Sequence, residues 1–276
     1  MIKKVLLPAF FCAATLGAHG ASIHTGLLNY WPMDGDASDT SGSYAESTGA
    51  TVDDGSVNGS VSFAAGLTGF GQTAVFPGGG GNNITIADPT AGTDDIDRSG
   101  ADLTLSFWFQ LNNVDTGWQG LVAHGEGTDY RVAVRGTNEP IQYAYAGGGA
   151  SSDIFSATTF GAQTAGDGLW HHLVATTAGS STALYIDGNL EAAGGTGPIS
   201  ENGANTLCIG CNPDRGREWN GLLDDVAMWD RALTQTEVTE IFSAGQAGLS
   251  LGQIPEPSTG ILGALAGLAV CLRRRR

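Results

Sequence analysis

The chain has 276 residues and carries 12 Lys and Arg against 28 Asp and Glu, for a formal net charge of −16. A protein this acidic repels a phosphate backbone, which argues against nucleic acid as a partner. The 43 glycines are too many for a helical protein and favour a β-protein with many tight turns.

Residues 1–20 have the layout of a secretory signal peptide. Lys3 and Lys4 precede an apolar stretch, Val5–Leu16, and the small residues of Ala18-His19-Gly20 follow. A buried first helix is the alternative, but the lysine pair and an early proline argue against it. We therefore expect this segment to direct export and to be removed.

Strand patterns dominate the rest of the chain. The clearest is Leu103–Leu111, where apolar side chains occupy the odd positions and mostly polar ones the even positions. Asp187-Gly188 is a strong hairpin turn signal. The expected strands are 27–33, 73–76, 83–87, 103–111, 120–123, 130–135, 141–146, 170–177, 182–186 and 221–229. Strands roughly every eight to twelve residues, with no helix between them, indicate an antiparallel sandwich or barrel and exclude a parallel α/β sheet.

Cys208 and Cys211 are the two cysteines that remain after the termini are removed. In an oxidising compartment a C-x-x-C pair can close a local disulfide. A redox pair would open a helix after a strand, whereas Leu207–Pro213 reads as a strand running into a turn. We expect a structural disulfide or two idle thiols, and a zinc site is disfavoured because no second pair exists.

One helix follows the last strand. Thr234-Gln235-Thr236-Glu237 is a capping box, Val238, Ile241 and Phe242 form an apolar stripe, and Gly245 is expected to end the helix. A lone amphipathic helix buries one face on the nearest sheet, so this one is expected to close the sandwich.

The C-terminal segment, 251–276, contains Pro255-Glu256-Pro257, an apolar run over Ser258–Leu272 and four terminal arginines. At ~1.5 Å per residue the apolar run spans only ~22 Å, against a hydrocarbon core of ~30 Å. It therefore favours transient membrane association over permanent anchoring, and the arginines hold that end on the cytoplasmic side.

This arrangement resembles the PEP-CTERM sorting signal of Gram-negative bacteria. The resemblance implies export through the inner membrane, removal of the tail by an exosortase, and a final location at the cell surface or in the extracellular matrix. An ordinary tail anchor is the alternative.

Five further blocks resemble LamG-like jelly-roll domains of the concanavalin A-like lectin/glucanase superfamily. They are Tyr30–Gly42, Leu103–Phe109, Trp170–Thr176, Ala183–Gly188 and Gly221–Leu233, in the right order. The resemblance implies an all-β, antiparallel jelly-roll sandwich over about 21–250 with one short C-terminal helix. The superfamily includes lectins, carbohydrate-binding modules, adhesion domains and glycosidases, so the fold does not settle the activity.

Catalysis is not expected. Glycosidases need two carboxylates about 5–10 Å apart across the sugar, and laminarinase-like members of the superfamily carry theirs in a Glu-x-Asp-x-(x-)Glu run. This chain has no such run; its glutamates are scattered singly. His171 and His172 are adjacent on a strand, so they point to opposite faces and cannot serve one site together.

A structural calcium site is predicted from Asp34, Asp36, Asp39 and Asp225. Calcium prefers several oxygen ligands on loops, and three of these acids follow the first strand closely. In jelly rolls of this kind the first and last strands run antiparallel beside each other, which would bring Asp34 close to Asp224 or Asp225, only one of which can point inward. The alternative is that these acids serve turn and Asx chemistry only.

Trp118 and Trp219 are the best candidates for a glycan-binding platform, supported by Tyr130 and Tyr143. Both tryptophans lie among polar loop residues, and flat aromatic faces beside polar groups suit sugars. The alternative for each is a buried tryptophan that closes one end of the sandwich.

These features together predict an exported, exosortase-sorted, non-catalytic protein that binds glycan or other extracellular matrix components at the cell surface. The rival is a structural matrix protein with no specific ligand. A glycoside hydrolase-like enzyme ranks third.

Overall fold

The computed structural model describes residues 22–44, 47–48, 52–87, 95–125, 129–145, 153–160, 167–195, 197–200, 206–213 and 215–255. The chain divides into two units, one formed by Met1–Ser22 with Pro255–Arg276 and the other by Ile23–Ile254. The predicted signal peptide, Glu256, Pro257, the apolar run and the arginines lie outside the described residues. The strands, the helices and the candidate sites all belong to the unit Ile23–Ile254.

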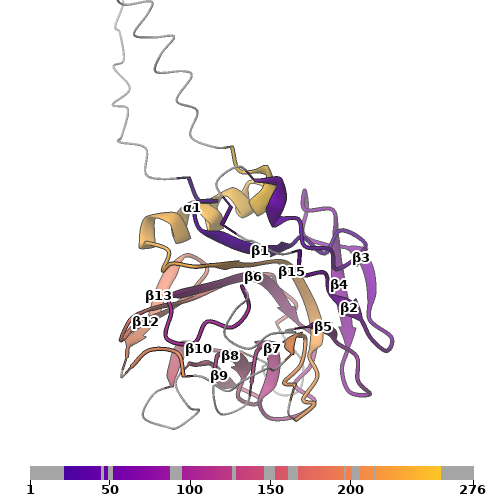
Figure 1. Cartoon of the computed structure of the whole chain (residues 1–276). Helices are drawn as coiled ribbons and strands as arrows, with labels where there is room; N and C mark the ends of the chain where they lie inside the picture. The colour runs from indigo at the N-terminus through magenta and orange to yellow at the C-terminus, as the bar shows by residue number, and fades with distance from the viewer. Residues whose placement is uncertain are drawn as a thin grey trace, which may run out of the picture. The chain divides into compact units, whose positions relative to one another are not determined.

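Two antiparallel sheets face each other in this unit (Figure 1). Sheet A has the order β13-β12-β11-β6-β15-β4-β3, with β1 also pairing with β15, and sheet B has the order β10-β9-β8-β7-β14-β5-β2. Sheet A comprises β1 (Leu27–Trp31), β3 (Ser62–Ala65), β4 (Gln72–Pro77), β6 (Leu103–Leu111), β11 (His171–Ala178), β12 (Ser181–Ile186), β13 (Asn189–Gly194) and β15 (Asn220–Trp229). Sheet B comprises β2 (Ser56–Val57), β5 (Ile84–Ile86), β7 (Gln119–Ala123), β8 (Arg131–Val134), β9 (Glu139–Ala144), β10 (Ile154–Phe160) and β14 (Leu207–Ile209). The predicted all-β, antiparallel jelly-roll sandwich is confirmed.

The main core lies between the sheets, and strand β6 shows how the sequence builds it. Its odd positions, Leu103 to Leu111, all join the core cluster, as the alternation predicts. Its even positions Thr104, Ser106 and Trp108 are buried too. The outer face of sheet A is therefore covered rather than exposed to solvent.

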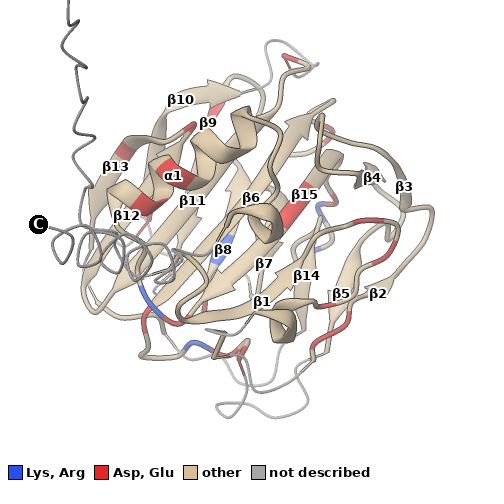
Figure 2. Cartoon of the chain, turned by 90° about the horizontal axis from the view of Figure 1, so that it is seen from above, with Lys and Arg blue, Asp and Glu red and all other residues tan. Residues whose placement is uncertain are grey.

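Helix α1 (Gln235–Gln246) provides that cover (Figures 1 and 2). The predicted capping box is present: the Thr234 side chain accepts a hydrogen bond from the Glu237 amide, and Glu237 accepts one from the Thr234 amide. Gly245 lies inside the helix rather than beyond its end. A Cβ there would come within 2.1 Å of the Trp108 ring, so the glycine permits close packing of α1 on sheet A instead of ending the helix.

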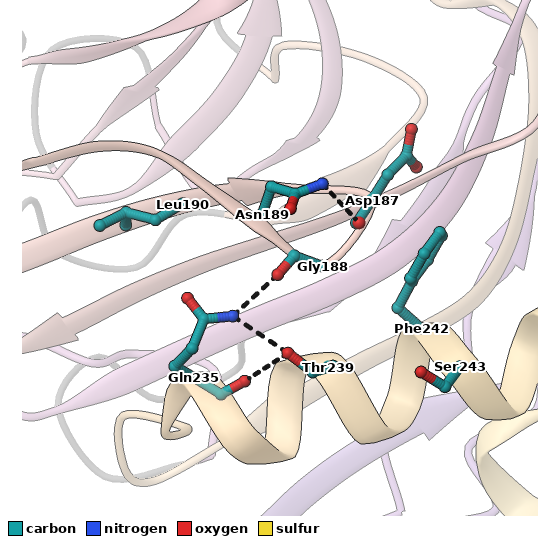
Figure 3. A pocket seen from close by; sticks show the side chains of 8 residues that line it. All are labelled: Asp187, Gly188, Asn189, Leu190, Gln235, Thr239, Phe242 and Ser243. Atoms are coloured by element: carbon teal, nitrogen blue, oxygen red, sulfur yellow. Dashed lines mark hydrogen bonds between the residues drawn. The ribbon is translucent and has the colours of Figure 1, made fainter.

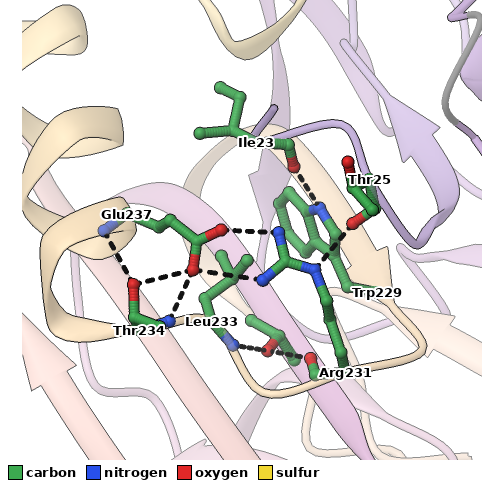
Figure 4. A network of polar contacts seen from close by, with 8 residues as sticks. Ile23, Thr25, Trp229, Arg231, Leu233, Thr234 and Glu237 are labelled. Carbon is green, nitrogen blue, oxygen red and sulfur yellow. Dashed lines mark hydrogen bonds and ion pairs between the residues drawn. The ribbon is translucent and has the colours of Figure 1, made fainter. Parts of the chain in front are cut away.

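A polar network joins α1 to the strands (Figure 4). The Arg231 guanidinium donates to both carboxylate oxygens of Glu237, at 2.7 and 3.1 Å, and its Nε donates to the carbonyl of Thr25 at 2.7 Å. The Trp229 indole donates to the carbonyl of Ile23 at 2.7 Å. The carbonyls of Ile23 and Thr25 lie just before β1, whereas Trp229 and Arg231 lie at the end of β15 and in the loop that enters α1. These bonds therefore hold the two ends of the domain together.

Two short 3-10 helices complete the described elements, η1 (Ser41–Ser43) and η2 (Leu251–Gln253). Leu251 and Ile254 are buried in a second apolar cluster with Tyr30, Trp229 and residues of α1. The folded domain therefore extends past residue 250. Within the described ranges, none of the helices combines the length and hydropathy that a membrane span requires.

Strand β15 has two neighbours on one side. Its first half, Asn220–Leu223, pairs with β4, and its second half, Val226–Trp229, pairs with β1. Between them the register shifts, and Asp225 has φ +50°. This bulge places two acidic residues where β1 ends and β4 begins. The antiparallel pairing of the first and last strands is as predicted.

Cys208 and Cys211 form a disulfide where β14 turns toward β15. Both cysteines are buried. The bond closes a loop of only a few residues, so its stabilising effect through chain entropy is small compared with that of a bond across a long loop.

Candidate functional site

Three of the four predicted platform aromatics are core residues, so they cannot contact a ligand. Trp219 is fully buried and packs edge to face against Phe109, with ring centroids 6.2 Å apart. The Tyr130 hydroxyl donates to the carbonyl of Ile96 at 2.8 Å, and the Tyr143 hydroxyl bonds that of Thr177 at 2.8 Å. Burial raises the pKa of Tyr143 well above its usual value. For these residues the prediction was wrong, because their side chains point between the sheets.

Trp118 is placed differently. It precedes β7, is partly exposed, and has φ +65°, an uncommon conformation for a bulky residue. The guanidinium carbons of Arg131 and Arg135 both lie 5.6 Å from the centroid of its ring. Because Val132 and Val134 face the core, the two arginines lie on the outer face of sheet B, and the Trp118 ring lies there with them.

A polar and aromatic row runs across this outer face. Ala133 on β8 pairs with Gln142 on β9, which in turn pairs with Phe155 on β10. The Gln142 carbonyl accepts a hydrogen bond from Arg131 at 2.8 Å, and its amide donates to Asp153. We call Trp118, Arg131, Arg135, Gln142 and Phe155 the Trp118 platform.

Arg135 connects the two aromatic rings of the platform. Its guanidinium carbon lies 5.7 Å from the centroid of Phe155 as well as 5.6 Å from that of Trp118. Its side chain is 49% exposed and pairs with Glu139 at 3.8 Å. Sequence reasoning missed the arginines, although the alternation of Arg131 and Arg135 with core valines on one strand was a usable signal.

The acidic residues predicted to bind calcium do not form one cluster. Asp36 accepts a hydrogen bond from the amide of Ser38 at 2.9 Å, which is an Asx turn. One carboxylate oxygen of Asp39 accepts from the amides of Tyr30 and Ser41, both at 2.9 Å. These two acids therefore organise the loop after β1. Among the described residues, no three His, Cys, Asp or Glu side chains are grouped as a metal ion would require.

Asp224 and Asp225 form a buried pair at the bulge of β15, which Figure 2 shows in red. Asp225 accepts hydrogen bonds from the Tyr30 hydroxyl and, at 2.6 Å, from the Leu251 amide. Both acids are buried, whereas strand alternation predicts that only one of them points inward. The reason is that the bulge breaks the alternation and α1 with η2 covers the outer face.

The two acids differ in how they are satisfied. Oδ2 of Asp224 is buried with no hydrogen-bond partner. Burial first, and then the charge of Asp225, raise the pKa of Asp224 to about 9. Burial also raises the pKa of Asp225, to about 7, although its hydrogen bonds to Tyr30 and Leu251 oppose the rise. The negative charge of Asp34 contributes to raising both pKa values. Because Asp34 follows β1 closely, the end of β1 lies near this acidic pair, as predicted for Asp34.

His171 and His172 point to opposite faces of β11, as predicted. The His171 ring packs against Phe109 and Phe160, while His172 packs against Trp108 and Phe242 on the outer side. Burial lowers the pKa of His172 to about 3. For His171 burial also opposes the charged form, but hydrogen bonds of 2.8 Å to Asp187 and to Asp167 outweigh it and raise the pKa.

The chain belongs to the concanavalin A-like lectin/glucanases superfamily, whose family model matches residues 78–239. A PEP-CTERM protein-sorting motif matches residues 253–276. Both resemblances inferred from the sequence are thereby confirmed. The motif indicates export and exosortase-dependent surface sorting.

One curated relative is the Adhesion G-protein coupled receptor V1 of Danio rerio, 27% identical over 148 residues, which are 51% of this chain and 2% of the receptor. This chain therefore corresponds to a small part of that protein.

Solved structures with the same fold include binding domains. One is the binding domain of Paraclostridial Mosquitocidal Protein 1, with a TM-score of 0.62 and 18% identity over 80% of this chain and 53% of that chain. Another is domain 4 of AbnA, a GH43 extracellular arabinanase from Geobacillus stearothermophilus, in complex with arabinotriose. Its TM-score is 0.56, with 19% identity over 80% of this chain and 98% of that chain. At these identities the likeness shows the fold alone.

Proposed function

We propose that this protein is a non-catalytic domain that binds glycan or other matrix polymers at the cell surface through the Trp118 platform. The observation that carries the proposal is a partly exposed tryptophan on the outer face of sheet B, with φ +65° and with two arginine guanidinium carbons each 5.6 Å from the centroid of its ring. Residues in such backbone conformations cost about 1–3 kcal/mol and concentrate at functional sites.

The chemistry of the platform suits a sugar. The aromatic faces of Trp118 and Phe155 can pack on the apolar face of a pyranose or furanose ring. The guanidinium of Arg135, which is 49% exposed, lies beside them as a hydrogen-bond donor for hydroxyl groups, whereas Gln142 is buried and supports the row from beneath through its bonds to Arg131 and Asp153. Pairing in register across β8, β9 and β10 keeps these groups on one rigid surface, and preorganisation lowers the cost of binding.

Two further observations support a binding role over catalysis. Two acids at the platform already have partners in the described part of the chain, since Asp153 accepts a hydrogen bond from Gln142 and Glu139 pairs with Arg135. The structural neighbours include a toxin binding domain and an arabinanase domain in complex with arabinotriose. Exosortase-dependent sorting would deliver such a domain to the cell surface, where matrix polysaccharides are found.

A glycan array probed with residues 21–254, with and without calcium, tests the proposal. We expect binding to a limited set of polysaccharide fragments, and loss of the same signals in Trp118→Ala but not in Leu169→Ala. Leu169 is a suitable control because it is also exposed, at 61%, and lies outside the platform. An array on which both variants and the wild type give the same pattern would contradict the site, and no binding at all would favour the purely structural rival.

We also propose a structural cation that contacts Asp34 and Asp224, in place of the four acids predicted from the sequence. The supporting observation is that Oδ2 of Asp224 is buried without a partner while the exposed carboxylate of Asp34 acts on it. A cation bound there would replace the proton of Asp224 and compensate the charges of both carboxylates. If calcium binds only the native state, chelation should lower the thermal midpoint. A melting curve that is the same in chelator and in added calcium would contradict this cation site.

A further inference from the structure

A groove lies on the other side of the sandwich from the Trp118 platform, between the β12–β13 turn and helix α1 (Figure 3). Its volume is about 460 Å³, within the range of about 300–1,000 Å³ typical of small-molecule sites. The lining residues are Asp187, Gly188, Asn189, Leu190, Gln235, Thr239, Phe242 and Ser243. None of these belongs to the Trp118 platform, which is on sheet B.

The lining presents no uncompensated charge. Asp187 is the one acid in it, and both of its carboxylate oxygens are used: Oδ2 bonds Nδ1 of His171 at 2.8 Å, and Oδ1 accepts from the amide of His172 at 2.9 Å. In Figure 3 its carboxylate points away from α1. An anionic or cationic ligand would therefore lose its hydration without gaining an ion pair.

The polar groups of the groove are amides and hydroxyls held in place by one another. The Gln235 amide donates to the carbonyl of Gly188 at 2.8 Å and to the Thr239 hydroxyl at 3.1 Å, and that hydroxyl donates to the carbonyl of Gln235 at 2.8 Å. Asn189 and Ser243 are exposed on either side. The Asn189 amide donates to the carbonyl of Asp187 at 3.1 Å, so the side-chain oxygens of Gln235 and Asn189 are oriented by hydrogen bonds, and the exposed Ser243 hydroxyl lies beside them. These groups suit a ligand rich in hydroxyl groups.

The apolar part of the groove is rigid. The ring of Phe242 is partly exposed and is stacked on Trp108 at 5.8 Å and on His172 at 6.3 Å between centroids. Gly188 faces that ring with φ +76°, and a Cβ there would lie 3.1 Å from it. Leu190 is 53% exposed at the edge. An aromatic ring backed by two others, beside neutral hydrogen-bonding groups, is the combination that sugar rings use.

We propose that this groove is a second saccharide site, selective for an uncharged mono- or disaccharide unit. It is independent of the Trp118 platform, and it would let one domain hold two glycan chains on opposite sheets. Such bivalency can raise the avidity for a matrix by about 10²–10⁴ without a new contact, provided that both sites can be engaged at once.

The test uses amide NMR spectra of residues 21–254, because both apolar clusters lie inside the compact unit Ile23–Ile254. The probes are cellobiose, lactose and arabinotriose at about 10 mM, tenfold above a Kd of about 1 mM, with glucuronate as the charged comparison. We expect at least one neutral probe to shift the side-chain amide signals of Asn189 and Gln235, and glucuronate to leave them in place.

Variants then separate this groove from the platform. Asn189→Ala and Ser243→Ala should each weaken the neutral probe by about 2- to 10-fold, since each removes one hydrogen-bonding group. Ser181→Ala, an exposed serine at the other end of β12, should not. Trp118→Ala should leave the Asn189 and Gln235 shifts intact. The proposal is overturned if no neutral probe shifts these amides, if glucuronate shifts them equally, or if Trp118→Ala abolishes the shifts.

Discussion

Trp118→Ala should mainly weaken ligand binding, because its ring is on the outer face of sheet B. Trp219→Ala should mainly lower stability, because its ring is in the core. Trp219 is fully buried, and its indole donates to the carbonyl of Leu222 at 3.4 Å. Its truncation leaves a cavity that should cost about 3–5 kcal/mol of unfolding free energy. In a domain of this size the thermal midpoint should fall by about 2–4 °C per kcal/mol, or about 6–20 °C in total.

For Trp118 the loss of stability is smaller. The ring is partly exposed, and its truncation removes the stacking on Arg131 and Arg135, where each cation–π interaction contributes about 0.5–1 kcal/mol at such a site. Trp118→Ala should therefore cost about 1–2 kcal/mol of stability, while ligand binding weakens by about 1–3 kcal/mol, the range for the removal of an aromatic side chain from a hot spot.

Circular dichroism melts and calorimetric titration with the best array ligand would measure both quantities in each variant. Leu169→Ala provides the baseline for removing an exposed apolar side chain. The reasoning fails if Trp118→Ala destabilises the domain as much as Trp219→Ala does, or if a folded Trp118→Ala protein binds the ligand as tightly as the wild type.

Three further predictions concern the acidic pair, the cation and the tail. The pKa of Asp224 is raised to about 9, so the stability from its protonated form is complete below its unfolded pKa of about 3.9 and is lost as pH rises toward 9. In the presence of chelator, the wild type should lose up to about 4 kcal/mol more unfolding free energy between pH 5 and pH 8 than Asp224→Asn does. Urea titrations at each pH would measure this, and parallel curves of unfolding free energy against pH would contradict it. In calcium the same substitution should lower the thermal midpoint relative to the wild type, because it removes a ligand, whereas an unchanged response to calcium would point away from Asp224. Intact-mass analysis of the secreted protein from an exosortase-bearing host should show that the C-terminal arginines are gone, and detection of Arg276 on the mature form would rule out the sorting mechanism.

Local features of the sequence were sufficient for most of the strands, the helix start and the sorting motif, but they missed the strands β2, β3, β10 and β13. The alternation over Leu103–Leu111 predicts β6 because side chains on a strand alternate between faces. The capping box at Thr234 and Glu237 predicts the start of α1 because its hydrogen bonds join residues only three positions apart. Such signals survive in the sequence because every atom involved is close along the chain.

The placement of the site depended on residues far apart in the sequence. Trp118 and Trp219 have similar polar neighbours in the chain, and only strand pairing decides that one ring lies on the outer face of sheet B and the other between the sheets. Gly245 was expected to end a helix, but packing against Trp108 gives it a different role. The direction of the Asp225 side chain is set at a bulge of β15, which lies between the half of the strand that pairs with β4 and the half that pairs with β1. In each case the sequence determined which local structure forms, whereas the direction of the side chain was decided by long-range contacts between strands.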